Sequence, residues 1–251
     1  MHKLQVLTKA IATIQNWPAY LADYAKVKQG DLTYVLRDGS RYVVRAGSND
    51  RNIFNEIVIH QLYTRDGFDI HPGDIIMDIG AHIGLFSVFA SQRALQVYAL
   101  EPVPENFAML EKNIEVGKRT NITAINKAVA ATTGSRELFF DESNKGGHSF
   151  FSSIEKQKEK QMVIETISFA DLWQEQNIER IDFLKLDCEG GEYEILFTCP
   201  LDLLSKIKKV SMEYHPIDQE RNEKTLKKFF EEHGFSVRLV PEQSMLYATR
   251  A

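Results

Sequence analysis

From residue 74 onward, the chain alternates short apolar runs with segments of helical periodicity. The apolar runs have the length of buried strands, and they lie at 74–79, 96–101, 122–127, 181–187 and 209–214. The helical patterns lie at 84–94, 105–116, 192–197 and 226–233. Strands that alternate with helices predict a mostly parallel sheet with helices on both faces.

Two more strands are predicted at 236–240 and 245–249, joined only by Pro241-Glu242-Gln243-Ser244. Such a short connection favours antiparallel pairing. A closing hairpin of this kind distinguishes the sheet from a plain dinucleotide-binding fold, which would end on another parallel strand. The alternation is interrupted at 134–169. There we expect a strand at 136–140, a mobile loop that carries His148 over the site, and a return strand at 162–167.

The N-terminal part has a different pattern. Apolar residues spaced by three and four predict an amphipathic helix that Pro18 ends or kinks, and they are Leu4, Leu7, Ile11, Ile14 and Trp17. Asp38-Gly39 between two alternating runs predicts a β-hairpin, and 53–63 predicts a helix. We therefore expect a helical and β-hairpin cap over 1–70 and a main domain over 71–251. The first helix packs as a cap in this interpretation, with a subunit or membrane-surface contact as the alternative.

Composition narrows the class of protein. The 251 residues are 43% hydrophobic and 26% charged, which suits a large α/β domain with an added segment. A net charge of -5 and the lack of a dense Lys/Arg stripe argue against a nucleic-acid partner. Only two cysteines, no long apolar run and no signal-peptide pattern predict a cytoplasmic protein without a transmembrane segment.

Residues at the predicted strand ends carry the candidate chemistry, because ligands of open parallel sheets bind outside the carboxyl ends of the strands. Gly80 follows the first strand and permits a sharp turn. The helix after Gly84 offers unpaired N–H groups to an anion. The alternative is that Gly84 serves only tight helix–strand packing. Glu101 follows Gly80 by 21 residues, near the offset at which an acid binds ribose hydroxyls. The pattern indicates a ribose-bearing cofactor.

The turn does not carry the G-x-G-x-x-G pattern of dinucleotide-binding proteins. It reads Asp78-Ile79-Gly80-Ala81-His82-Ile83-Gly84, with an acid just before the turn. This form is more similar to S-adenosylmethionine sites, and the closing hairpin favours the same interpretation.

Residues from about 48 to 215 resemble the FkbM family of S-adenosylmethionine-dependent methyltransferases. The resemblance rests on the 78–84 turn, on 98–102 with Asn106, on 185–192, on 212–215, and on Ser48-Asn49-Asp50 with Glu56. The 185–192 block, K-x-D-x-E-G-x-E, is the most specific. The resemblance implies a class I methyltransferase sheet, S-adenosylmethionine as cofactor, and O-methylation of a sugar or secondary-metabolite hydroxyl. The acceptor would be a small molecule or a glycan.

The resemblance also implies residue roles. The turn would surround the methionine portion of the cofactor. Glu101, with Pro102, would contact the ribose, and the end of the third strand would contact the adenine. The expected cofactor-binding residues are Asp78, Gly80, Ala81, His82, Gly84, Glu101, Pro102, Asn126 and Ala128. Asn126 could equally be an edge-strand residue.

Removal of the hydroxyl proton requires a base. Asp187 is the first choice, because a charge at the end of a buried strand needs a partner or a ligand. His215 is the second choice, since an unperturbed imidazole titrates near neutral pH. The alternative is a helix- or loop-facing residue held by Pro216. Glu189 is either catalytic or caps the helix from Glu192. No metal is expected, because no D-x-D or H-x-H motif is present.

Two other classes stay open at this point. A NAD-dependent oxidoreductase would share the ribose-binding acid, and a non-catalytic nucleoside-binding module would share the fold. The acceptor pocket is expected between the N-terminal segment and the 141–160 loop.

Overall fold

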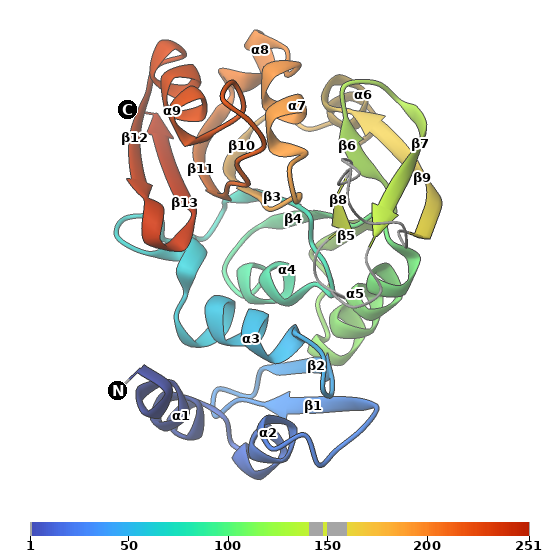
Figure 1. Cartoon of the computed structure of the whole chain (residues 1–251), viewed down its shortest axis with the longest axis vertical. Helices are drawn as coiled ribbons and strands as arrows, with labels where there is room; N and C mark the ends of the chain where they lie inside the picture. The colour runs from blue at the N-terminus through green and yellow to red at the C-terminus, as the bar shows by residue number, and fades with distance from the viewer. Residues whose placement is uncertain (1, 141–147, 150–159, 251) are drawn as a thin grey trace.

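The computed structural model describes residues 2–140, 148–149 and 160–250, with side chains described for 5–138 and 162–250. The central sheet has seven strands in the order β12-β13-β11-β10-β3-β4-β5 (Figure 1). The strands are β3 (Ile75–Ile79), β4 (Gln96–Leu100), β5 (Ile122–Ile125), β10 (Ile181–Leu186), β11 (Ile207–Glu213), β12 (Phe235–Val240) and β13 (Met245–Arg250). Only β13 runs against its neighbours. This confirms the expected class I methyltransferase sheet with its terminal antiparallel hairpin.

Helices cover both faces of the sheet. One face carries α4 (Leu85–Ala90) and α5 (Pro104–Gly117), and the other carries α6 (Phe169–Glu175), α7 (Glu192–Phe197), α8 (Leu201–Leu204) and α9 (Glu223–Glu232). Side chains of the strands alternate between the two apolar cores, as the period of two requires. In β3, Ile76 joins the core beneath α4 and Met77 joins the opposite core.

The N-terminal segment is two helices rather than one. The chain leaves α1 (His2–Thr13) at Ile14, which pairs with Leu36, and begins α2 (Trp17–Tyr24) with Pro18 in its first turn. Proline suits a first turn because the missing N–H would have no partner there. Trp17, expected on the apolar stripe of the first helix, instead begins α2 and is 37% exposed. The predicted hairpin is confirmed as β1 (Asp31–Val35) and β2 (Arg41–Arg45).

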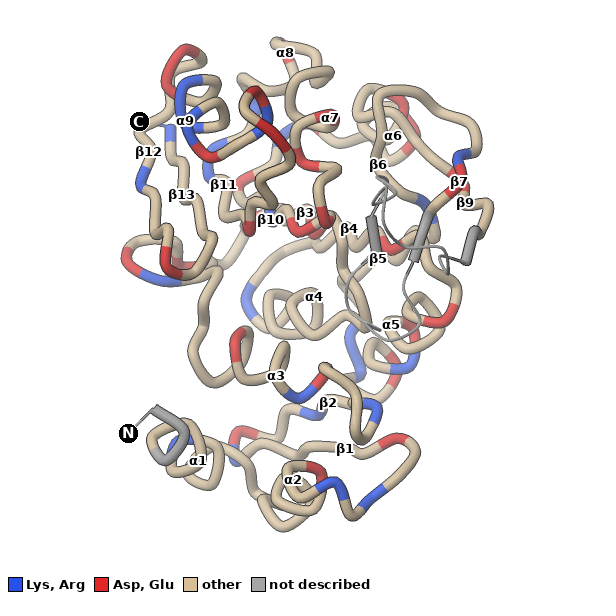
Figure 2. The backbone as a smooth tube through the Cα atoms, viewed as in Figure 1, with Lys and Arg blue, Asp and Glu red and all other residues tan. Residues whose placement is uncertain are grey.

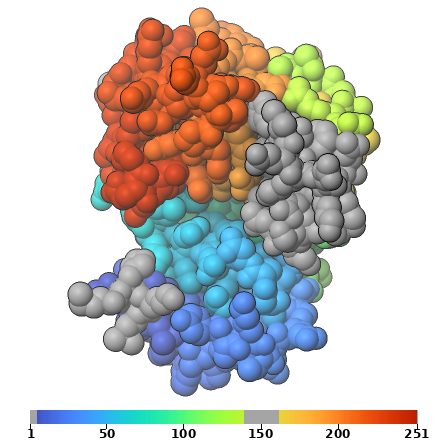
Figure 3. Space-filling view, in the orientation of Figure 1, coloured from blue at the N-terminus to red at the C-terminus, as the bar shows by residue number. Residues whose placement is uncertain are grey.

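The predicted helix over 53–63 is a composite. It consists of α3 (Asp50–Phe54), a π-helix η1 (Asn55–Ile59), and a separate 3₁₀ turn η2 (Leu62–Thr64). Its apolar side chains join the core that also holds Tyr34 of the hairpin and Phe86 of α4. The N-terminal segment, shown in blue in Figures 1 and 3, therefore packs directly on the α4 side of the molecule.

A second sheet interrupts the alternation between β5 and β10. It has the order β6-β9-β7-β8, with β6 (Ala128–Ala130), β7 (Gly134–Phe140), β8 (His148–Ser149) and β9 (Lys160–Ser168). The antiparallel pairing of β7 with β9 confirms the predicted strand and its return strand. The expected loop falls at 141–147 and 150–159, outside the described residues, as does the side chain of His148. Within the described ranges, no helix has the length and apolar character that a bilayer crossing needs.

Candidate active site

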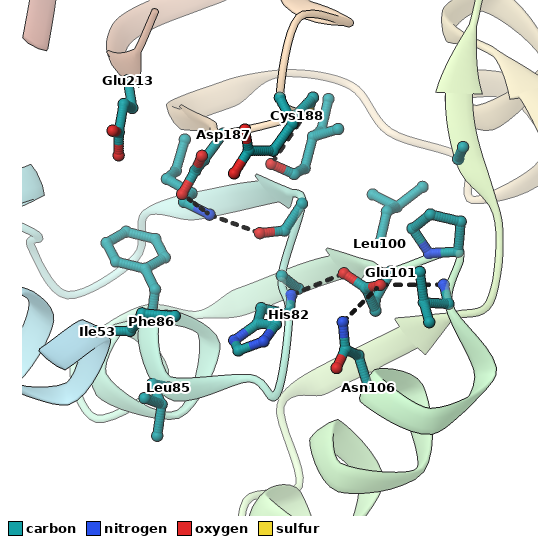
Figure 4. Close-up of a pocket in the computed structure, with 18 of the residues that line it drawn as sticks. Ile53, His82, Leu85, Phe86, Leu100, Glu101, Asn106, Asp187, Cys188 and Glu213 are labelled. Carbon is teal, nitrogen blue, oxygen red and sulfur yellow. Dashed lines mark hydrogen bonds and ion pairs between the residues drawn. The ribbon is translucent and has the colours of Figure 1, made fainter. Parts of the chain in front are cut away.

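A cavity of about 270 Å³ opens at the carboxyl ends of the parallel strands (Figure 4). The chain runs outward from β3 to β5 and returns to β10, which lies beside β3. This change of direction creates a crevice between the ends of β3 and β10, where α/β proteins bind ligands. Residues that follow four strands line it: 79–82 after β3, 100–103 after β4, 187–189 after β10, and Glu213 on β11.

The turn after β3 requires glycine at position 80. Gly80 has a φ of +78°, and a Cβ atom there would lie 1.8 Å from the carbonyl oxygen of Asp187. The amides of Gly80 and Ala81 both donate to the carbonyl of Leu100, at 3.1 and 2.9 Å. These bonds hold the turn against the end of β4, so that its backbone forms a wall of the cavity.

Gly84 has a different role. A Cβ atom at this position would lie 2.4 Å from Cδ1 of Leu110, and the residue does not line the cavity. This geometry supports the packing alternative, in which the glycine lets α5 approach the turn closely.

A buried ion pair lies beneath the turn. Asp78 and Lys185 are register partners on β3 and β10, and their side chains meet at 3.1 Å on the α4 side of the sheet. Ser87 donates to Asp78 at 2.6 Å, and the Lys185 ammonium donates to the carbonyl of Gly80 at 2.7 Å. Burial alone would lower the pKa of Lys185, but the charges of Asp78 and Asp187 outweigh it and raise that pKa. Asp78 thus fixes the turn from below and does not itself line the cavity.

Glu101 lies in the cavity wall with its carboxylate held by three donors. One oxygen accepts the N–H of His82 at 2.8 Å, and the other accepts the N–H of Val103 at 3.0 Å and the Asn106 amide at 3.5 Å. Burial raises the pKa of Glu101 to about 7, although the hydrogen bonds act in the opposite direction. A carboxylate has about four acceptor sites, so this one keeps capacity for a ligand hydroxyl.

His82 joins the cavity to the N-terminal segment. Its Nε2 lies 3.0 Å from Nη2 of Arg45, which forms an ion pair with Asp50 at 2.8 Å. Burial lowers the pKa of His82 to about 4. The imidazole is therefore neutral at physiological pH and accepts the Arg45 hydrogen bond, which makes it a structural contact of the cavity wall rather than a proton carrier. Arg45 is a supporting residue that the sequence analysis missed.

Asp187 faces the cavity from the end of β10. The Tyr63 hydroxyl donates to Oδ2 of Asp187 at 2.9 Å, and the Lys185 ammonium lies 3.8 Å from the same oxygen. Within the described part of the chain, Oδ1 makes no hydrogen bond. Tyr63, which the sequence analysis did not single out, thus orients Asp187 and leaves one carboxylate oxygen available.

Three more carboxylates surround this end of the cavity: Glu56 from η1, Glu189 after β10, and Glu213 of β11. Figure 2 shows acidic segments gathered near the ends of β3 and β10. Burial, together with neighbouring carboxylates, raises the pKa of Glu189 and of Glu213 to about 7. Burial and the charge of Asp187 also raise the pKa of Glu56. Such crowding of negative charge is relieved by a cation.

His215 lies behind this acidic end and does not line the cavity. Its Nδ1 is 3.0 Å from Glu192, and its Nε2 is 3.6 Å from Glu189. Burial would lower the pKa of His215, but the hydrogen bond and charge of Glu192 raise it to about 9. The ring therefore carries a proton at neutral pH, which counters the hypothesis that His215 is the base.

The expected helix cap at Glu189 is replaced by Glu192. The fully buried carboxylate of Glu192 accepts the N–H groups of Cys188 at 2.8 Å and Gly190 at 2.9 Å. Glu189 has a φ of 50° and no capping bond to α7. Its side chain instead lines the cavity and lies 3.6 Å from Nε2 of His215.

The opposite end of the cavity is more apolar. Lys127, Ala128, Val129 and Leu138 line it, with Pro102 beside them. Asn126 does not line the cavity. Its amide donates to the carbonyls of Glu101 at 2.8 Å and Pro102 at 3.1 Å, and so fixes the end of β4.

The geometry of the cavity also bears on two other kinds of chemistry, a reactive cysteine and a bound metal ion. Cys188 lines part of the cavity and is partly buried. Burial raises the pKa of its thiol well above the ordinary value, which disfavours a thiolate. Over the described ranges, no group of three or more His, Cys, Asp or Glu residues is placed to hold a metal ion.

Residues 78–237 match the family described as the Methyltransferase FkbM domain. The match covers more than half of the chain, and the chain therefore belongs to the FkbM methyltransferase family. This confirms the resemblance found in the sequence. It also favours methyl transfer over the alternative of a NAD-dependent oxidoreductase.

Similar proteins include methyltransferases of different organisms. The chain is 27% identical to the 31-O-demethyl-FK506 methyltransferase FkbM of Streptomyces tacrolimicus, over 78% of this chain and 85% of that protein. It is 29% identical to the hexuronic acid methyltransferase AglP of Haloferax volcanii, over 49% of this chain and 48% of that protein. Among solved structures, an FkbM methyltransferase from Methylobacillus flagellatus aligns with a TM-score of 0.49 and 16% identity, over 74% of this chain and 46% of that one.

Proposed function

We propose that the protein transfers a methyl group from S-adenosylmethionine to a hydroxyl of a small-molecule or glycan acceptor. The observation that carries the proposal is the convergence of the Gly80 turn, Glu101 and Asp187 on one cavity at the ends of β3, β4 and β10. The family assignment supplies the reaction class.

The residues present fit this cofactor. Glu101 has acceptor capacity for a ribose hydroxyl, and the Gly80 turn presents its backbone to the cavity. The apolar end near Ala128 and Val129 suits a purine ring. The acidic end at Asp187, Glu189 and Glu213 suits the positive charges of the sulfonium and amino groups.

When bound, the cofactor would supply an electrophilic methyl group. Asp187 would accept the proton of the acceptor hydroxyl at Oδ1, while Tyr63 holds Oδ2. The acceptor O–H bond breaks as the new C–O bond forms and the C–S bond of the cofactor breaks. The products are a methyl ether, S-adenosylhomocysteine and a protonated Asp187.

Two relatives support a hydroxyl-bearing acceptor by their descriptions. One acts on 31-O-demethyl-FK506, and the other on a hexuronic acid. The net charge of -5 agrees with a small or glycan acceptor rather than a nucleic acid.

The test is incubation of the purified protein with S-adenosylmethionine carrying a ¹³C-labelled methyl group and with fractions of cell extract. We expect the label in a small molecule or glycan, with the ¹³C chemical shift of a methyl ether. A label on nitrogen or carbon would contradict O-methylation. Tight binding of S-adenosylhomocysteine without transfer to any fraction would favour the non-catalytic module.

A further inference from the structure

A second cavity of about 620 Å³ lies between α1, α2 and the continuous segment of α3 and η1. It shares two lining residues, Asn49 and Glu56, with the cavity proposed to bind the cofactor. The two cavities therefore meet at the start of α3 and the first turn of η1. A ligand in the second cavity would reach the methyl-transfer site past these two side chains.

A row of asparagines faces the second cavity. Asn49, Asn52 and Asn55 are spaced by three along α3 and η1, which places them on one side of the helix. Asn52 donates to Oδ1 of Asn49 at 2.8 Å, and Tyr20 donates to Oδ1 of Asn55 at 3.1 Å.

These bonds leave specific amide atoms unused. Among the described residues, Nδ2 of Asn49, Oδ1 of Asn52 and Nδ2 of Asn55 have no hydrogen-bond partner. They form a set of two donors and one acceptor. Hydroxyl groups both donate and accept hydrogen bonds, so a ligand with several hydroxyls is complementary to this row.

An aromatic and cationic pair forms another wall. The side chain of Tyr24 is 50% exposed, and the Arg51 guanidinium lies 5.1 Å from the centre of its ring. Arg51 donates to the carbonyl of Asp23 at 3.0 Å, while its Nε has no partner in the described structure. An exposed ring beside polar donors suits the alternating C–H faces and hydroxyl edges of a sugar.

Glu56 marks the junction. It lies in the π-helix η1, a conformation that is frequent at functional sites. In the part of the chain that the structure describes, its carboxylate forms no hydrogen bond or ion pair. A hydroxyl that passes from one cavity to the other would therefore find a free acceptor there.

We infer that the second cavity binds the body of the methyl acceptor, and that the acceptor is a polyhydroxylated ring compound, either a sugar or a molecule that bears one. The inference rests on the proposed function for its placement beside the reacting methyl group. The ligand class itself follows from the asparagine row and Tyr24.

Saturation-transfer NMR tests this inference on the full chain with S-adenosylhomocysteine present. The probes are methyl β-glucopyranoside, methyl β-glucuronide and, as an apolar ring alcohol, cyclohexanol. We expect transfer to the ring protons of at least one glycoside. The signal should fall about fivefold or more in Asn52→Ala and in Tyr24→Ala, as the loss of a single contact implies.

Two surface variants serve as matched controls. Gln174→Ala removes an exposed amide on α6, and Leu95→Ala removes a side chain that is 61% exposed and distant from this cavity in the chain. Both should bind the glycosides like the wild type. Glycoside signals that are unchanged in Asn52→Ala and Tyr24→Ala, or transfer to cyclohexanol alone, would overturn the inference.

Calorimetry with S-adenosylhomocysteine separates this inference from the proposed function. If S-adenosylhomocysteine binds all variants equally and no glycoside binds the wild type, only this inference fails. If the glycosides bind as expected and S-adenosylhomocysteine does not, the sugar-binding cavity stands and the proposed methyl donor is wrong.

Discussion

At the scale of single residues, Glu101 is the position where cofactor recognition depends most on ionisation. Ribose hydroxyls donate to a carboxylate, so they bind its ionised form better. Because the pKa of Glu101 in the free protein is about 7, cofactor affinity should rise as pH increases through 7 and level off above it.

Calorimetry with S-adenosylhomocysteine at pH 6, 7 and 8 measures this effect. We expect Glu101→Gln to bind about tenfold more weakly at pH 8, as a lost charged hydrogen bond implies, and with less pH dependence. Glu213 also titrates near 7, and Glu213→Gln is therefore the matched control. A pH dependence that survives in Glu101→Gln but disappears in Glu213→Gln would contradict the assignment.

Substitution of Asp187 should change turnover without changing cofactor affinity. If its Oδ1 accepts the hydroxyl proton, Asp187→Asn should lower turnover about 10²–10⁴-fold, with nearly unchanged affinity for S-adenosylhomocysteine. Tyr63→Phe, which removes only the orienting hydrogen bond, should lower turnover less. Equal turnover of Asp187→Asn and wild type would move the role to another carboxylate of the acidic end, such as Glu213.

Gly80 and Glu101 line the cavity where the sequence placed them, because turn geometry and strand spacing are local rules. Tyr63 and Arg45 were not predicted, because each contacts a residue far away in the sequence. Tyr63, for example, reaches Asp187 across 124 positions of sequence.

At the scale of elements, substituting alanine for each of the two glycines of the first turn should affect folding differently. A Cβ at position 80 would meet backbone at 1.8 Å, whereas at position 84 the nearest atom is the flexible end of Leu110 at 2.4 Å and backbone lies at 3.2 Å. Both glycines have positive φ, +78° and +82°, so alanine is strained at each. Gly80→Ala should prevent native folding or cofactor binding. Gly84→Ala should keep binding and lower the free energy of unfolding by about 1–3 kcal/mol. Urea unfolding and calorimetry distinguish them, and equal effects would refute the difference in roles.

The turn between β10 and α7 should also make stability depend on pH. His215 has a pKa near 9 in the folded protein, above its ordinary value of about 6.5. The stabilisation is therefore fully present below pH 6.5 and is lost as pH rises through 9, by about 3 kcal/mol. The melting temperature of wild type should fall more steeply between pH 7 and 10 than that of His215→Gln. Parallel curves for the two proteins would contradict the Glu192–His215 interaction.

The elements themselves were largely predictable. Apolar runs located five of the seven strands of the main sheet, because strands covered on both faces of a parallel sheet are rich in apolar residues. The short connection at 241–244 identified the last two strands as a hairpin. The short strand β6 was missed, since three residues carry too little pattern. The π-helix at Asn55–Ile59 was also missed, because a change from i→i+4 to i→i+5 bonding has no clear apolar signature.

At the scale of the whole molecule, the N-terminal segment and the main sheet share one apolar core that includes Tyr34, Phe54 and Phe86. The segment also reaches the cavity wall through Arg45 and His82. The division into a cap over 1–70 and a methyltransferase domain over 71–251 stays a prediction. This packing shows that the N-terminal segment shares its core with the sheet instead of having a separate one.

The central claim, that the cavity at the ends of β3, β4 and β10 binds S-adenosylmethionine, is tested most directly by calorimetry. S-adenosylhomocysteine and NAD are titrated separately into the wild-type protein and into Glu101→Gln. We predict one site for S-adenosylhomocysteine in the wild type, weakened about tenfold in the variant, and no binding of NAD. Binding of NAD without binding of S-adenosylhomocysteine would contradict it.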